Sequence, residues 1–163
     1  MRDSKEKTFG SDILLVTKTD LKGKITYANL HFMEIVAMSE DELVGSPHNI
    51  VRHPDMPKII FKILWQNLQN EKEVHAYVKN SCADGGYYWV FANVTPSFDV
   101  NGKVIGYHSS RRNPTPEALA IIKPFYKELL NAEKSGGINA SEAILNKLLQ
   151  EKGVEYDEFI LSF

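Results

Sequence analysis

The side chains best suited to bind a ligand are concentrated in one short, proline-rich segment. Residues 46–57 carry Asn49, Arg52, His53 and Asp55, directly before a strongly apolar stretch. Amide, guanidinium, imidazole and carboxylate groups together can hold a polar ligand through charge-assisted hydrogen bonds. The residue types alone also allow a plainer arrangement, in which Arg52 and Asp55 form a surface ion pair and His53 caps a turn.

No catalytic motif accompanies this segment. The sequence contains no Gly-x-Ser-x-Gly motif, no Walker loop and no His-Glu-x-x-His zinc motif. A metal site built from His48, His53 and Asp55 would have no recognised ligand spacing. The sequence therefore predicts binding and not enzymatic catalysis.

The elements around this segment follow the order of two strands, helices and three strands. Two β-rich runs, 13–18 and 24–28, flank turn residues at 20–23 and predict a hairpin. Apolar residues at three- and four-residue spacing then predict short helices, followed by a longer amphipathic helix over 56–69. Alternating runs separated by glycine-containing turns predict three further strands, at 74–80, 87–97 and 103–111.

These elements predict an α+β fold. Two strands cannot bury a sheet face alone, so we expect one five-stranded antiparallel sheet with the helices packed across one face. The layer between helices and sheet has room for a ligand. After 113–116 the helical pattern returns, with a break at 135–137. We divide the chain into an N-terminal cap or tail (1–11), a central domain (12–114) and a C-terminal helical extension (115–163).

Four motifs have a recognisable spacing: Thr19-Asp-Leu with Ile25-Thr-Tyr-Ala-Asn29, Gly45-Ser-Pro-His-Asn-Ile-Val-Arg-His-Pro-Asp-Met-Pro57, Tyr88-Trp-Val-Phe-Ala-Asn93, and Gly106-Tyr107 followed by Arg111. Together they resemble the FAD-binding PAS domain of bacterial aerotaxis and energy-taxis receptors. The second motif is much more specific than a lone glycine motif. The resemblance covers residues 12–130 and implies a PAS fold for 12–114, with FAD as the cofactor.

By position, the resemblance implies a flavin site formed by Asn29, Arg52, His53, Asp55, Phe61, Trp65 and Asn80. Asn80 stands nine residues before Trp89, where flavin-binding PAS domains place an amide on the pyrimidine edge. An amide suits that edge because it both donates and accepts hydrogen bonds. The alternatives are a turn-capping role for Asn80 and a core pair for Phe61 and Trp65.

The strand over 88–96 separates two faces. Side-chain alternation places Val90 and Ala92 on one face and Trp89 and Phe91 on the other. We assign Val90 and Ala92 to the ligand side, because bulky rings there would fill the slot. Trp89 and Phe91 then face the C-terminal helices, a second copy of the chain or a partner.

The predicted mechanism is a redox response. Positive charge from Arg52, and from His53 if protonated, would stabilise an anionic reduced flavin. Two other readings remain open. One is a haem domain with His53 or His48 as axial ligand. The other is a ligand-free PAS interaction module whose pocket is filled by its own side chains.

The single cysteine does not fit light-driven chemistry. Cys82 falls near the end of a predicted strand. Light-oxygen-voltage (LOV) photosensors of the PAS family instead carry their reactive cysteine in an Asn-Cys-Arg motif on the ligand-facing helix. Here Asn49 is followed by Ile50, so we do not expect formation of a flavin–cysteine adduct.

Composition limits the partners. A charged content of 25%, a hydrophobic content of 43% and a net charge of −2 describe an ordinary globular protein with no electrostatic signal for nucleic acid. The charged N-terminus lacks the apolar core of a signal peptide, so we expect a cytoplasmic protein without membrane insertion. The resemblance implies signalling to a separate, membrane-bound chemotaxis transducer, and a homodimer could form through the outer sheet face or the terminal helices.

Overall fold

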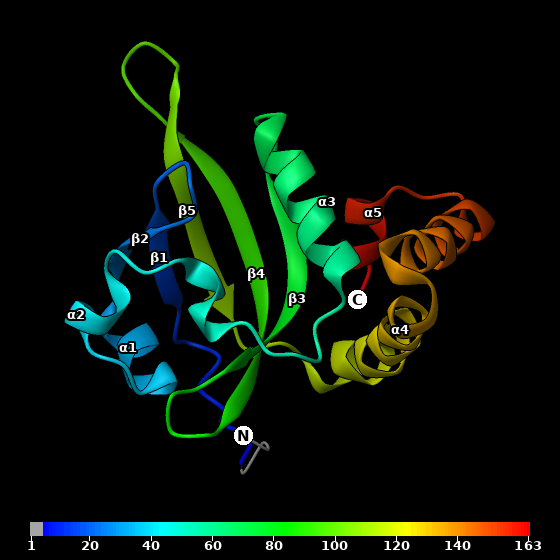
Figure 1. Ribbon diagram of the computed structural model, residues 1–163, viewed down its shortest axis with the longest axis horizontal. Helices are drawn as coiled ribbons and strands as arrows, with labels where there is room; N and C mark the ends of the chain where they lie inside the picture. The colour runs from blue at the N-terminus through cyan, green and yellow to red at the C-terminus, as the bar shows by residue number, and fades with distance from the viewer. Residues whose placement is uncertain (1–4) are drawn as a thin grey trace.

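A five-stranded antiparallel sheet forms the centre of the protein in a computed structural model that describes residues 5–163 (Figure 1). The strands lie in the order β2-β1-β5-β4-β3, and each neighbouring pair is antiparallel. Their bounds are β1 (Leu15–Thr19), β2 (Ile25–Ala28), β3 (Val74–Ser81), β4 (Tyr87–Phe98) and β5 (Val104–Arg112). The predicted sheet is confirmed.

The segment between β2 and β3 forms the helical layer. It contains α1 (Leu30–Val36), α2 (Glu40–Leu43), a single 3-10 turn η1 (His48–Val51) and α3 (Lys58–Gln69). Figure 1 shows α1 and α2 beside strands β1 and β2, and α3 beside strand β3. The long helix begins at Lys58 and not at Met56, because Pro57 stands at its N-cap.

The sheet face toward this layer carries much of the hydrophobic core. Fully buried side chains come from the strands and from the helices that cover them. The largest are Tyr88, Phe32, Leu15, Ile25, Leu43, Ile59 and Ile60. Tyr88, Val90 and Ala92 of β4 are buried in this core, and Trp89 between them is buried as well.

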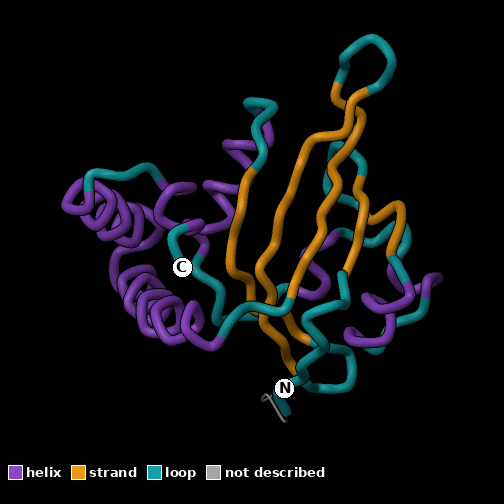
Figure 2. The backbone as a smooth tube through the Cα atoms, turned by 180° about the vertical axis from the view of Figure 1, so that it is seen from behind, coloured by secondary structure: helices purple, strands orange, loops and turns teal. Residues whose placement is uncertain are grey.

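The C-terminal residues form α4 (Pro116–Lys152) and α5 (Tyr156–Leu161). Thr115 caps α4 by accepting a hydrogen bond from Ala118 N. The helical path is interrupted at Gly137, whose φ of 70° and ψ of −167° agree with the break predicted there. Both helices lie beside the β3 edge of the sheet when it is seen from the front and from behind (Figures 1 and 2).

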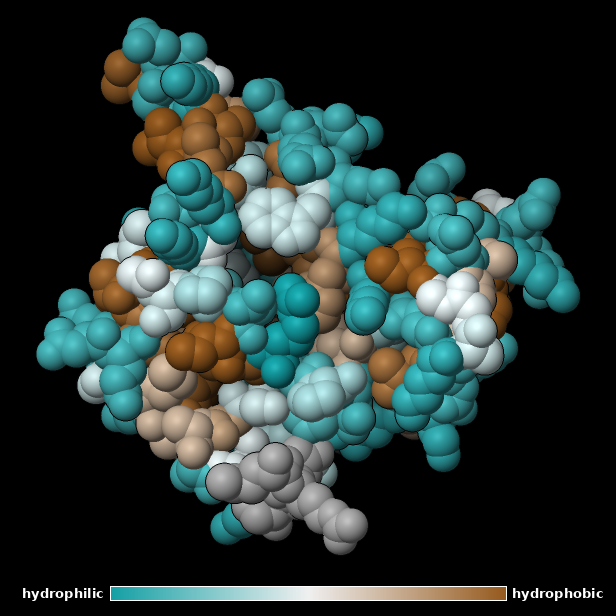
Figure 3. Space-filling model, in the orientation of Figure 1, coloured by the Kyte–Doolittle hydropathy of each residue, from teal (hydrophilic) through white to brown (hydrophobic). Residues whose placement is uncertain are grey.

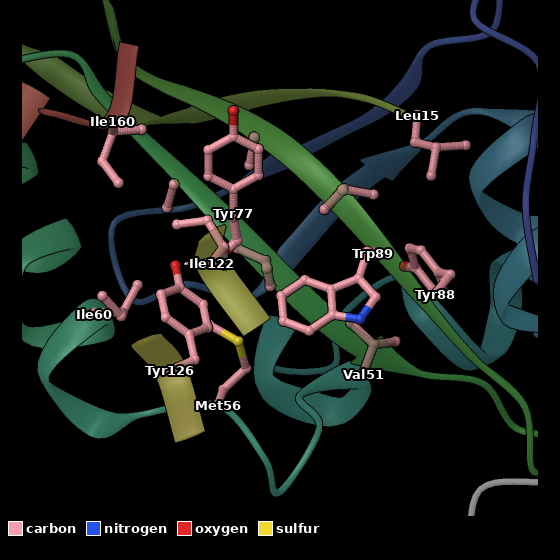
Figure 4. Close-up of a cluster of buried hydrophobic side chains, with 14 of the residues drawn as sticks. Leu15, Val51, Met56, Ile60, Tyr77, Tyr88, Trp89, Ile122, Tyr126 and Ile160 are labelled. Carbon is pink, nitrogen blue, oxygen red and sulfur yellow. Dashed lines mark hydrogen bonds between the residues drawn. The ribbon is translucent and has the colours of Figure 1, made fainter. Parts of the chain in front are cut away.

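Tyrosine side chains attach these helices to the sheet. Tyr126 Oη donates to the Tyr77 carbonyl at 2.6 Å, and Tyr156 Oη donates to the His75 carbonyl at 3.0 Å. The Tyr126 ring also packs 6.0 Å from the Trp89 ring, and Figure 4 shows both rings in one buried cluster. Of the three contacts predicted for Trp89, the structure shows the one with the C-terminal helices.

Candidate functional site

A cavity of about 350 Å³ lies between the helical layer and the inner face of the sheet. It opens between η1 and α3, on the face of the molecule shown in Figure 3. Its volume falls in the range of roughly 300–1,000 Å³ that is typical of small-molecule sites. The cavity is lined by Thr17, Thr19, Lys22, Gly23, Pro47, His48, Asn49, Arg52, Phe61, Leu64, Trp65, Leu68, Val78, Asn80, Ala92, Val94, Tyr107, Ser109 and Arg111.

Two walls of the cavity are apolar and face each other. One wall is Phe61, Leu64 and Trp65 on α3, and the opposite wall is formed by sheet residues such as Val78 and Ala92. Aromatic and aliphatic walls of this kind accept a flat ring system and exclude water from it. A pocket filled by its own side chains is therefore not what the structure shows.

One rim of the cavity combines aromatic rings with a cation. The Trp65 side chain is 37% exposed and packs edge-on against Tyr107, with ring centroids 5.6 Å apart. The Arg52 guanidinium stacks 3.8 Å above the Phe61 ring. Partial burial lowers the pKa of Arg52 from its usual value, and the group remains a cation at neutral pH. Lys22 adds a second cationic side chain to the lining.

A buried cation lies deeper, where β5 pairs with β1. Arg111 is 5% exposed, and its Nη1 donates to Thr17 Oγ1 at 3.0 Å while its Nη2 donates to His48 Nε2 at 2.7 Å. Its guanidinium also lies 5.4 Å from the centroid of the Phe32 ring. Burial lowers the pKa of Arg111 to about 10, so the side chain stays charged at neutral pH.

His48 is the neutral partner of this cation. Burial, followed by the charges of Arg111 and Arg52, lowers the pKa of His48 to about 3. Because Nε2 accepts a hydrogen bond from Arg111, the proton of the neutral ring belongs on Nδ1. His48 therefore supplies an acceptor that holds the guanidinium in place.

The cavity carries positive charge without acidic compensation. Among residues 5–163, no Asp or Glu lines it, and no carboxylate lies within ion-pair distance of Arg111. The Ser109 hydroxyl, on the same face of β5, is buried without a hydrogen-bond partner in that part of the chain. A buried cation normally has a counter-charge, and a buried hydroxyl normally has a hydrogen-bond partner. Arg111 and Ser109 therefore point to a ligand that carries negative charge and accepts hydrogen bonds.

Asn80 faces the same space from β3. It is 4% exposed, and its Nδ2 donates to Tyr88 Oη at 3.2 Å. Burial raises the pKa of Tyr88, so that hydroxyl stays protonated and can accept this hydrogen bond. A backbone bridge joins Asn80 to Arg52, which ties β3 to the proline-rich segment.

Five of the nine residues predicted for the site meet in the cavity. They are Arg52, Phe61, Trp65, Asn80 and Ala92. Whether they hold a cofactor remains a prediction. Val90, on the same face of β4 as Ala92, is fully buried in the core and does not line the cavity.

The other three predicted residues have structural roles outside the cavity. Asn29 caps α1, because its Oδ1 accepts from Phe32 N at 3.0 Å. His53 Nδ1 accepts from Asp55 N at 3.0 Å, which is the turn-capping arrangement. Asp55 pairs with Lys79 at 2.9 Å and not with Arg52.

From the sequence, Thr17, Ser109 and Arg111 are not assigned to the flavin site, and His48 is considered only as a ligand of haem or of a metal ion. One signal was available. Tyr107, Ser109 and Arg111 alternate along β5, so a hydroxyl and a guanidinium share the face expected to be apolar. Their proximity to His48 depends on the β1–β5 pairing, which is a long-range contact.

The geometry gives no support to the haem and metal alternatives. His48 directs Nε2 at a guanidinium, and His53 lies outside the cavity. Among residues 5–163, no three His, Cys, Asp or Glu side chains are grouped so that they could hold a metal ion. Cys82 is buried near the end of β3 and does not line the cavity.

Comparisons with known proteins agree with the fold and the motifs. The aerotaxis receptor of Escherichia coli K12 is 42% identical over 118 residues, which are 72% of this chain and 23% of the receptor. A nitrogen fixation regulatory protein of Klebsiella pneumoniae is 26% identical over 98 residues, 60% of this chain and 20% of that protein. The chain thus spans less than a quarter of the length of these relatives. No helix within residues 5–163 is both long and apolar enough to cross a membrane.

Solved structures show the same architecture. The dark structure of the blue-light photoreceptor Aureochrome1 LOV has a TM-score of 0.57 and 19% identity, and covers 74% of this chain and 84% of its own. A light-oxygen-voltage domain studied with a flavin analogue has a TM-score of 0.58 and 20% identity, and covers 71% of this chain and 87% of its own. The profile of the PAS fold family matches residues 25–111. The chain therefore belongs to the PAS fold family.

Proposed function

We propose that this chain is a sensory PAS domain that binds a flavin, FAD, in the 350 Å³ cavity and reports redox state to a chemotaxis transducer. The observation that carries the proposal is the buried Arg111, which has no carboxylate partner among residues 5–163 and lies beside a cavity with apolar walls. The relationship to an aerotaxis receptor supports the signalling role. Two solved structures of the same architecture, the Aureochrome1 LOV photoreceptor and a LOV domain studied with a flavin analogue, support the ligand class.

The residues present fit such a group. Phe61 and Trp65 would cover one face of the ring, and the Asn80 amide can both donate to and accept from a pyrimidine edge. Ser109 supplies a buried hydroxyl that has no hydrogen-bond partner among residues 5–163. Lys22, in the lining, can pair with phosphate, which is the feature that favours a nucleotide form of the flavin.

When bound, a flavin supplies reversible electron transfer, and the protein supplies position and charge. Arg111 holds a positive charge in a water-poor position, where it acts more strongly than in solvent. It therefore favours a ligand state with more negative charge. The sequence predicted that Arg52 and His53 stabilise this negative charge. Because His53 lies outside the cavity, we assign the role to Arg52 and Arg111 instead. We propose signalling through contact and no catalysis by this domain, which would act in the cytoplasm.

The test is the flavin content of the purified protein. We expect a yellow protein that releases FAD on denaturation. Arg111→Gln should retain flavin at least about tenfold more weakly, which corresponds to about 1.4 kcal/mol. Arg112→Gln is the matched control, because Arg112 is the next residue on β5 and is exposed. Urea unfolding of both variants verifies that each is folded.

Three results would contradict the proposal. If the wild-type protein is colourless and gains no thermal stability from added FAD or flavin mononucleotide, it does not bind a flavin and the proposal is wrong. If the folded Arg111→Gln and Arg112→Gln variants bind flavin with equal affinity, the buried cation Arg111 does not contribute to flavin binding. A haem-type spectrum would select the haem alternative.

A further inference from the structure

A second hollow, of about 410 Å³, lies between α4 and the strands β3 and β4. Its rim carries four lysines, Lys79 on β3 and Lys123, Lys127 and Lys134 on α4. Two aromatic rings, Trp89 and Tyr126, form part of its floor. None of these residues lines the flavin cavity, so the two sites are separate.

The lysines of α4 are a concentrated and uncompensated charge. Lys123, Lys127 and Lys134 are exposed, and their spacing of four and seven residues places them on one helix face. Within residues 5–163, none of these three lysines forms an ion pair. The one acidic residue of the lining, Asp55, already pairs with Lys79 at 2.9 Å. Four lysines and one aspartate give this hollow a net charge of +3, on a chain whose net charge is −2.

The floor of the hollow is aromatic and recessed. Trp89 is 8% exposed, Tyr126 is 2% exposed, and Figure 4 shows the two rings together in a buried cluster. Cations at the rim above recessed rings are complementary to a chain that presents acidic side chains beside an apolar one. A membrane surface is flat and would meet only the lysines, so this shape favours a protein segment.

The hollow and the cavity share two backbone segments. Arg52 lines the cavity while Asp55, three residues later, lines the hollow. On β3, Asn80 lines the cavity while its neighbour Lys79 lines the hollow. The Asp55–Lys79 ion pair and the Arg52–Asn80 backbone bridge join the same two segments. These links form a short backbone route from Arg52 and Asn80 to the rim of the hollow.

We propose that this hollow docks an acidic, aromatic-containing segment of the protein that receives the signal. Its use as an output rests on the proposed sensory function, whereas the docking itself does not require a flavin. Lys123, Lys127 and Lys134 contact the acidic side chains of that segment, and an apolar side chain of the segment reaches the rings below.

The experiment measures binding of a fluorescein-labelled peptide composed of Asp, Glu and Phe to the full chain at physiological ionic strength. The double variant Lys123→Glu/Lys127→Glu should bind this peptide at least about tenfold more weakly than wild type. The control Lys72→Glu/Lys103→Glu has the same change in net charge, at two exposed lysines that do not line the hollow, and should bind as wild type does. Flavin content, measured on the same samples, should be equal in all three proteins.

Each outcome decides the proposal. Equal weakening by both double variants would show unspecific charge attraction and overturn it, as would equal binding by all three proteins. Binding of wild type to vesicles of phosphatidylcholine and phosphatidylglycerol, without binding to the peptide, would assign the lysines to a lipid surface instead. Selective peptide binding by a protein that holds no flavin would support docking and reject the proposed redox function, so the two failures are distinguishable.

Discussion

Glu133 offers a sharp test of how the C-terminal helices hold the helix that walls the cavity. The N-cap residue of α3 is Pro57, whose side chain cannot accept a hydrogen bond. Glu133, on α4, takes that role from a distance: Oε1 accepts from Lys58 N at 2.8 Å, and Oε2 accepts from Ile59 N at 3.1 Å. Ser141 Oγ donates to the same carboxylate at 2.7 Å. Glu133→Ala should therefore destabilise the fold.

The magnitude follows from these contacts. Loss of an N-cap costs about 1 kcal/mol, and loss of a negative charge at a helix N-terminus costs about 0.3–1 kcal/mol. The hydrogen bond from Ser141 contributes about 1 kcal/mol more. We expect Glu133→Ala to lower the free energy of unfolding by about 2–3 kcal/mol. With a urea dependence of about 2 kcal/mol per molar, the unfolding midpoint falls by about 1–1.5 M.

The assay is urea unfolding followed by circular dichroism and by tryptophan fluorescence. Glu133→Gln retains an oxygen acceptor without the charge, so its free energy of unfolding should lie between those of Glu133→Ala and wild type. Glu128→Ala is the matched control, because Glu128 is an exposed glutamate on the same helix. If Glu133→Ala and Glu128→Ala shift the midpoint equally, α4 does not cap α3 and the reasoning is wrong.

Two further predictions concern buried groups. Tyr126→Phe removes the hydrogen bond to the Tyr77 carbonyl and should cost about 1–2 kcal/mol in urea unfolding, whereas the exposed Tyr27→Phe should cost almost nothing. The lowered pKa of His48, about 3 when folded, means that only the unfolded chain gains a proton at this residue as pH falls through about 6.5. The stability of flavin-free protein should therefore fall between about pH 7 and pH 5, and less so in His48→Gln. Equal pH dependence of the two proteins would contradict the assignment of His48 as a neutral acceptor.

The strands and helices could be predicted from the sequence, because the period of each element determines which of its side chains share a face. Alternation along β4 placed Ala92 on the cavity face and Trp89 on the other. The four-residue spacing of Phe61 and Trp65 placed both on one face of a helix, and the family resemblance assigned that face to the ligand site, where both residues line the cavity. The interruption at Gly137 followed from paired glycines in a helical pattern.

The side-chain directions in the proline-rich segment 46–57 could not be predicted in this way. Arg52, His53 and Asp55 are close in sequence, yet only Arg52 lines the cavity, because a turn without a fixed period sends successive side chains to different sides. Asn29 is another case, since an asparagine before a helix serves equally as a cap or as a ligand contact. The capping of α3 by Glu133 joins residues 74 positions apart or more, and no local pattern predicts it.

The energetics of Arg111 favour a ligand-binding domain over a ligand-free module. Burial lowers its pKa to about 10 from an ordinary value near 12.5. Because each pKa unit is worth about 1.4 kcal/mol, the charged form is disfavoured by about 3 kcal/mol in the flavin-free fold. An apolar side chain of similar volume would often be neutral or stabilising at such a position. A ligand-free module gains nothing from this cation, whereas a domain that binds an anionic ring gains a counter-charge already positioned by Thr17 and His48.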